Sequence, residues 1–117
     1  MENILIVVSD RQLLEDLSDC CRSEGFTPHS LTEGSYVLPW ISERGPTAII
    51  LDTGAEGVDT ATLCRGITAS SSAQLFVLTQ GDSEADQLKA EGLDVKIFFS
   101  KPLESALVLS QVKSLLS

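Results

Sequence analysis

Short runs of apolar residues recur along the chain, and residues that favour turns bound each of them. Runs of this length, without alternation of polar and apolar positions, are typical of strands buried on both faces of a sheet. Residues 26–31 are less apolar and contain Pro28, which cannot donate a ladder hydrogen bond and therefore favours an edge position. The pattern predicts strands at residues 4–8, 26–31, 48–52, 75–78 and 95–99.

Segments with helical spacing separate these strands. Leu13, Leu17 and Cys20 fall on one stripe of a helix that begins near Ser9 or Asp10, and Gly25 ends it. Further helices are expected around residues 37–41, after residue 59, and at residues 82–91 and 103–116. The last of these has more apolar positions than one buried stripe needs, so some of its side chains should be exposed.

The alternation of strand and helix repeats five times with short connections, which predicts a parallel sheet covered by helices on both faces. Right-handed crossovers leave few topologies open. We therefore expect a single α/β domain over residues 1–117. It should be a doubly wound, flavodoxin-like sheet of five parallel strands in the order 2-1-3-4-5.

Composition narrows the function classes. A net charge of -9 argues against direct binding of nucleic acid, because phosphate contacts need clustered Lys and Arg. No apolar run has the length of a membrane span, and the N-terminus lacks the pattern of a signal peptide. Cys20, Cys21 and Cys64 have no metal-ligand spacing, so we expect buried, reduced thiols in a cytoplasmic protein.

Polar side chains end three of the predicted strands. Asp52 closes the third strand, Thr79 the fourth, and Lys101 follows the fifth. The carboxyl ends of parallel strands meet at one edge of the sheet, where doubly wound folds bind ligands. A plainer explanation, that Asp52 only begins a turn with Thr53 and Gly54, stays open on these residues alone. There is no glycine-rich phosphate loop and no base beside a nucleophile, which disfavours a flavodoxin-like enzyme or cofactor binder.

The order and spacing of these motifs resemble the receiver domain of two-component response regulators over the whole chain. The matching stretches are Ile4-Leu5-Ile6-Val7, Ile50-Leu51-Asp52, Gly57-Val58-Asp59, Val77-Leu78-Thr79 and Ser100-Lys101-Pro102. The resemblance implies that Asp52 is the phosphoacceptor, that Thr79 is the hydroxyl that contacts the acyl phosphate, and that Lys101 is the ammonium that pairs with it. It also implies that Phe98 is the aromatic switch residue.

The sequence departs from the family where Mg²⁺ would bind. Two acidic residues follow the first strand in the family, and Val8 and Ser9 stand at those positions here. Mg²⁺ needs oxygen ligands, usually with carboxylates among them, so we expect its binding to be weak or absent and no other cofactor. Asp10 is either a displaced acid for this site or, as cap statistics favour, the N-cap of the first helix.

The rim of the site departs as well. The family has side chains that position the attacking water where Gly54 and Gly81 stand, so any phosphate formed should be slow to hydrolyse. Gln80 replaces a small residue. It either crowds the entrance or is a solvated loop residue, and the sequence does not decide between the two.

The resemblance and its departures predict an atypical receiver domain that is not an enzyme. We expect an interaction module in two-component or phosphorelay signalling, with weak or no Mg²⁺-dependent phosphorylation. The alternative is a functional phosphoacceptor that a histidine kinase phosphorylates on Asp52. Expected partners are a histidine kinase or an output domain, with a homodimer through the last helices, and neither nucleic acid nor a membrane.

Overall fold

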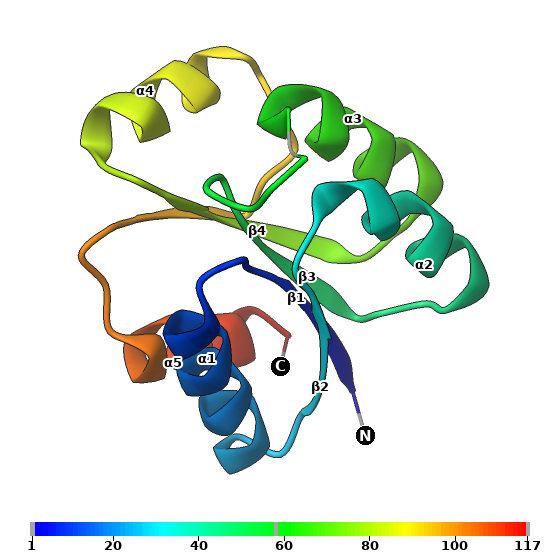
Figure 1. The fold of residues 1–117 in the computed structure, drawn as a ribbon, viewed down its shortest axis with the longest axis vertical. Coiled ribbons are helices and arrows are strands. Elements are labelled where there is room, and N and C mark those ends of the chain that lie inside the picture. Colours follow the sequence, from blue (N-terminus) through cyan, green and yellow to red (C-terminus); the bar gives the residue numbers. More distant parts are fainter. Residues whose placement is uncertain (1, 58, 117) are drawn as a thin grey trace.

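A twisted parallel sheet forms the centre of the molecule. The computed structural model describes residues 2–57 and 59–116 (Figure 1). The five strands are paired in parallel in the order β2-β1-β3-β4-β5, which confirms the predicted fold class. Their bounds are β1 (Asn3–Val7), β2 (Thr27–Leu31), β3 (Ala48–Asp52), β4 (Gln74–Thr79) and β5 (Ile97–Ser100).

Helices cover both faces of the sheet, with α1 and α5 on one side and α2, α3 and α4 on the other (Figure 1). The alternation of side chains along β1 accounts for the two layers. Ile4 and Ile6 pack with residues of α1 and α5, whereas Leu5 and Val7 pack with residues of α2 and α3. The helices are α1 (Arg11–Ser23), α2 (Val37–Glu43), α3 (Thr60–Ser70), α4 (Asp82–Ala90) and α5 (Ser105–Leu116), and a 3₁₀ turn, η1 (Gly34–Tyr36), precedes α2.

Two elements begin two residues later than the pattern predicted. The last strand begins at Ile97, because the N–H of Val95 turns back to the carbonyl of Leu93 and does not pair in the sheet. The last helix begins at Ser105, and its first turn is closed by a bond from the N–H of Val108 to the carbonyl of Glu104. Among the described helices, none has the length and apolar character needed to cross a lipid bilayer.

The three cysteines lie where the helix pattern places them. Cys20 is half-buried in α1, Cys21 and Cys64 are buried, and all three are free thiols. Burial raises the pKa of Cys21 to about 12 and the pKa of Cys64 to about 11. Both thiols are therefore protonated at neutral pH and pack as apolar groups in the core.

The last two helices are held very differently. Ala85 is the buried residue of α4, and Leu88 is only partly buried against the α2–α3 side of the core. In α5, Val108, Leu109 and Val112 are all buried. Leu107 and Leu115 of the same helix are 57% and 44% exposed, as expected from its surplus of apolar positions.

Hydrogen exchange should separate these two helices. Because α4 buries little apolar area, its backbone amides should open locally, and we expect protection factors about tenfold or more below those of α5. The measurement is native-state exchange by NMR, with amides of the central strand β3 as the reference for slow exchange. Equal protection of α4 and α5 would contradict the expectation.

Candidate functional site

Asp52 is a buried carboxylate with hydrogen-bond partners on both of its oxygens. It is the last residue of β3 and is 2% exposed. Its Oδ1 accepts from the N–H of Gly54 (3.0 Å) and from Nε2 of Gln80 (2.9 Å), and its Oδ2 accepts from Nζ of Lys101 (3.0 Å). The bond to Gly54 is the one expected if Asp52 begins a turn. The turn and the charged site are therefore both present, and one does not exclude the other.

Lys101 brings the positive charge to this carboxylate. It follows β5, at the same edge of the sheet as the end of β3, and its side chain is 26% exposed. The ammonium also lies 3.3 Å from Oε1 of Gln80. Ionised donors and acceptors make the stronger hydrogen bonds, so the pair with Asp52 is the dominant contact at this edge. Lys101 therefore pairs directly with Asp52 at the carboxyl edge of the sheet.

Thr79 and Phe98 lie close to this edge but are engaged elsewhere. Thr79 ends β4 and is fully buried. Its hydroxyl donates to the carbonyl of Gly81 (3.0 Å) and lies 3.1 Å from Oγ of Ser100, and none of its described hydrogen bonds reaches Asp52. Phe98 is half-buried in β5 and packs against the core on the α2–α3 side of the sheet.

A second set of hydrogen bonds joins the segments that follow β3 and β4. Gln80 Nε2 donates to Thr53 Oγ1 (3.1 Å) as well as to Asp52. Oε1 of Glu84, in the first turn of α4, accepts from the N–H of Gln80 (2.9 Å) and from the hydroxyl of Thr53. Gln80 is an exposed loop residue whose amide also covers the Asp52 carboxylate, so both of its interpretations hold in part. Sequence reasoning missed Thr53 and Glu84. A glutamate in the first helical turn, which often accepts from N–H groups just before the helix, was the available signal for Glu84.

The polar side chains that follow β1 are engaged in hydrogen bonds with backbone groups. Val8 is fully buried in the core between the sheet and helices α1 and α5. The hydroxyl of Ser9 donates to the carbonyl of Thr32 (2.7 Å) and accepts from the N–H of Glu56 (2.9 Å). Oδ1 of Asp10 caps α1 by accepting from the N–H groups of its first turn, at 2.9 and 3.2 Å. The cap interpretation of Asp10 is the one the structure bears out.

Comparisons with known proteins agree with this architecture. No family model matches the chain. The chain is 31% identical over 113 residues to the transcriptional regulatory protein BaeR of Escherichia coli, covering 97% of this chain and 47% of BaeR. It is 26% identical over 116 residues to the sensory transduction protein RegX3 of Mycobacterium tuberculosis, covering 99% and 51%. It thus spans about half the length of the curated relatives it matches.

The structural neighbours share the whole fold. A response regulator receiver domain (CheY-like) from Methylobacillus flagellatus superposes with a TM-score of 0.86 at 16% identity, covering 100% of this chain and 99% of that domain. The chain has the fold of a response-regulator receiver domain, and the relatives that it matches in sequence are response regulators. Such domains are signalling modules and not classical enzymes.

The side chains of this receiver domain do not fit Mg²⁺ as the family would hold it. Mg²⁺ requires near-octahedral oxygen ligation. Val8 offers no oxygen, the Ser9 hydroxyl is committed to two backbone groups, and Asp10 caps a helix. Within residues 2–57 and 59–116, no three His, Cys, Asp or Glu side chains come close enough together to hold a metal ion.

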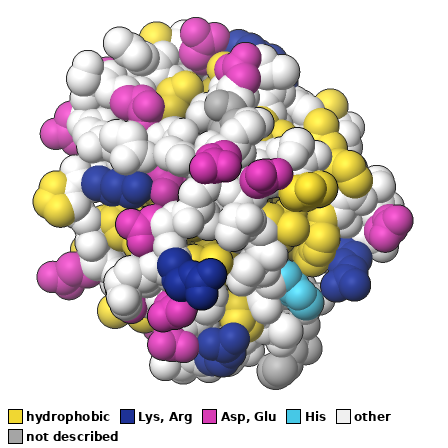
Figure 2. Space-filling view, in the orientation of Figure 1, with side chains coloured by type: hydrophobic (Ala, Val, Ile, Leu, Met, Phe, Trp, Pro, Cys, Tyr) yellow, Lys and Arg dark blue, Asp and Glu magenta, His cyan; other side chains and the backbone are white. Residues whose placement is uncertain are grey.

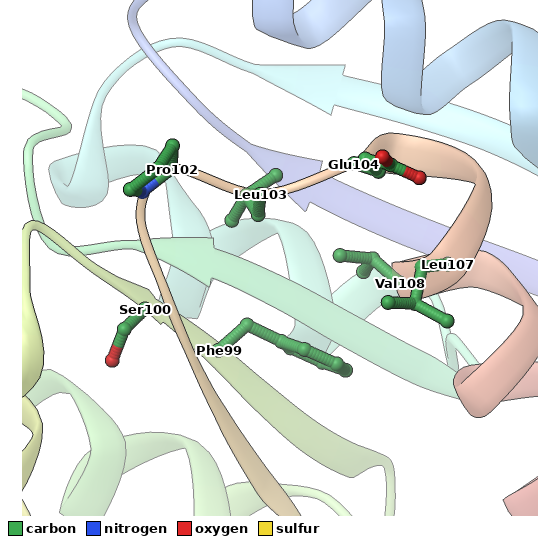
Figure 3. Close-up of a pocket in the computed structure, with 7 residues that line it drawn as sticks. All are labelled: Phe99, Ser100, Pro102, Leu103, Glu104, Leu107 and Val108. Carbon is green, nitrogen blue, oxygen red and sulfur yellow. The ribbon is translucent and has the colours of Figure 1, made fainter.

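An apolar hollow of about 470 Å³ lies between the end of β5 and the start of α5 (Figure 3). Its lining residues are Phe99, Ser100, Pro102, Leu103, Glu104, Leu107 and Val108. The ring of Phe99 and the side chains of Leu107 and Val108 border it in the close-up. Asp52 does not line this hollow, so the hollow and the candidate site are separate features of the receiver.

Proposed function

We propose that this receiver is a protein-interaction module in two-component or phosphorelay signalling, and that its partner binding does not depend on Mg²⁺-assisted phosphorylation. The observation that carries the proposal is the occupation of both Asp52 oxygens by Lys101, Gln80 and the Gly54 amide. A carboxylate that attacks phosphorus needs a free oxygen facing the donor. In this site that oxygen is released only by breaking a charge-assisted hydrogen bond.

Electrostatics support the same proposal. A transferring phosphoryl group spreads negative charge over its equatorial oxygens, and catalysis consists mainly of positioning and neutralising that charge. In this site the ammonium of Lys101 is the cation that contacts Asp52. Acidic side chains are spread over the surface of a domain with net charge -9 (Figure 2). An anionic phosphodonor is therefore repelled at long range, whereas a basic partner surface is attracted.

The alternative is a working phosphoacceptor, and one feature favours it. Asp10 and Lys101 line the same hollow of about 300 Å³ between the start of α1 and the loop after β5. A carboxylate that left its capping position would therefore lie near the ammonium that contacts Asp52. In that case Asp10 would act as the displaced acid, and a histidine kinase would phosphorylate Asp52.

The partners we propose follow from the same arrangement. A histidine kinase or an output domain would recognise the conformation that the Asp52–Lys101 pair stabilises. The exposed Leu107 and Leu115 of α5 offer apolar area for a second copy of the chain. The net charge of -9 makes direct contact with nucleic acid unfavourable for this domain.

Intact-mass measurement after incubation with acetyl phosphate and Mg²⁺ tests the proposal. We expect the wild-type protein to gain no phosphoryl group over the course of the reaction, with Asp52→Asn as the matched control. A gain of one phosphoryl group in the wild type that Asp52→Asn abolishes would overturn the proposal and establish the alternative. Repeating the assay with Asp10→Asn would then show whether the displaced acid takes part.

A further inference from the structure

We propose that Gln80 is a positioning residue that covers the Asp52 carboxylate, and that Gly54 is the residue that leaves room for it. We call the side chains of Gln80, Thr53 and Glu84 the Gln80 latch. The inference rests on the proposed function only in taking Asp52 as the reactive position. It adds a specific residue that determines which reagents reach that carboxylate.

The amide of Gln80 contacts both members of the ion pair. Its Nε2 donates to Asp52 Oδ1 at 2.9 Å, and its Oε1 lies 3.3 Å from the ammonium of Lys101. An amide has a donor end and an acceptor end, so it matches a carboxylate and an ammonium at the same time. A small residue at this position, as the family has it, can make neither contact. The side chains of Gln80, Lys101 and Asp52 therefore form a closed ring of hydrogen bonds.

The backbone of Gln80 is held in place from the other side. Its N–H donates to Oε1 of Glu84 (2.9 Å), and the same oxygen accepts the hydroxyl of Thr53. Thr53 follows Asp52 directly, and its Oγ1 also accepts a hydrogen bond from Nε2 of Gln80 (3.1 Å). These bonds tie the loop between β4 and α4 to the loop between β3 and α3. These hydrogen bonds hold the backbone of Gln80 in place, so its side-chain amide is fixed next to Asp52.

Gly54 is complementary to the Gln80 side chain in size. A Cβ at position 54 would lie 2.9 Å from Nε2 of Gln80, closer than real Cβ atoms approach, and 3.5 Å from its Cδ, an ordinary contact distance. The conflicting atom is the end of a flexible side chain, so an alanine would displace the amide rather than the backbone. The lack of a side chain at position 54 and the long side chain at position 80 therefore fit each other.

Carboxylate labelling tests the latch without phosphodonor or metal. The folded protein is treated with a water-soluble carbodiimide and glycine ethyl ester, and peptide mass spectrometry follows the loss of the unmodified Asp52 peptide. Gln80→Ala should raise the rate of that loss about tenfold, the factor expected when one hydrogen bond to a charged acceptor is removed. Gln87→Ala, on the exposed surface of α4, is the matched control and should leave the rate unchanged.

Gly54→Ala gives an independent test, because it leaves Gln80 in the chain. It should raise the Asp52 rate by a similar factor, and the Gly54→Ala/Gln80→Ala double variant should show no further increase, since both changes open the same latch. If Gly54→Ala does not fold, the double variant, which removes the steric conflict, should fold and label like Gln80→Ala. A wild-type rate in Gln80→Ala would overturn the latch, and additive effects would overturn the role of Gly54. Phosphorylation of the wild type by acetyl phosphate would contradict the proposed function but would leave these labelling results standing.

Discussion

Lys101→Met should lower the free energy of unfolding by about 2–3 kcal/mol, because it leaves the Asp52 carboxylate buried without a cation. Methionine keeps most of the lysine stem, so the loss reports the charge and not the packing. The Asp52 side chain is 3% exposed, and removal of one partner of a fully buried pair costs about 3–5 kcal/mol. The lower figure applies here because Lys101 is partly exposed to solvent, which screens the interaction.

A surface pair provides the comparison for this measurement. Arg22 and Asp19 lie 3.1 Å apart on α1, and both side chains are more than half exposed. Arg22→Met should therefore cost less than about 1 kcal/mol in urea unfolding. The double variant Lys101→Met/Asp52→Asn should recover part of the loss, since neither charge is then left unpaired. If Lys101→Met costs no more than Arg22→Met, the Asp52–Lys101 pair does not hold the site together.

Restoring the acidic pair should make stability depend on magnesium. The double variant Val8→Asp/Ser9→Asp places two carboxylates beside Asp52. In the wild type, Val8 is a fully buried core residue. Without metal we expect a loss of about 3 kcal/mol or more, because charge is buried without a partner. Mg²⁺ at about a hundred times its dissociation constant should return about 2.7 kcal/mol.

Thermal unfolding with and without millimolar Mg²⁺ measures this effect, and NMR shifts of residues 52–54 and 79–81 locate it. The wild type should show neither a rise in Tm nor shifts at these residues. Val8→Asn/Ser9→Asn is the matched control, since it introduces oxygens of similar size without charge. A wild type that responds to Mg²⁺ as strongly as the double variant would show that Asp10 or backbone oxygens already bind the metal, and the proposed function would then be wrong.

The sheet could be predicted because its signals are carried by many residues at once. Each buried strand is a run of apolar residues, and the order of strands follows from the handedness of the connections. The Asp52–Lys101 pair could be predicted as well, because the ends of parallel strands must meet at one edge. The starts of β5 and α5 were less predictable, since a single turn at Val95 or a hydrogen bond to Glu104 decides each of them.

The Gln80 latch could not be predicted from the sequence. Gln80 has a flexible side chain whose amide can hydrogen-bond either to water or to a carboxylate. Its position therefore depends on the space left by Gly54. That space exists only after two loops from different parts of the chain are folded together. Thr53 and Glu84 are 31 residues apart, and no periodic pattern connects them.

The hydrogen bonds of Ser9 make an acidic pair at positions 8 and 9 hard to reach by single substitutions. Its hydroxyl both donates to the Thr32 carbonyl and accepts from the Glu56 amide, thereby joining the chain after β1 to the segments after β2 and β3. An ionised aspartate accepts hydrogen bonds but donates none. Ser9→Asp alone would therefore leave the Thr32 carbonyl without its donor. An aspartate at position 8 alone would place a charge in the core. Either single substitution therefore lowers stability, so a route from Val8 and Ser9 to an acidic pair passes through less stable proteins.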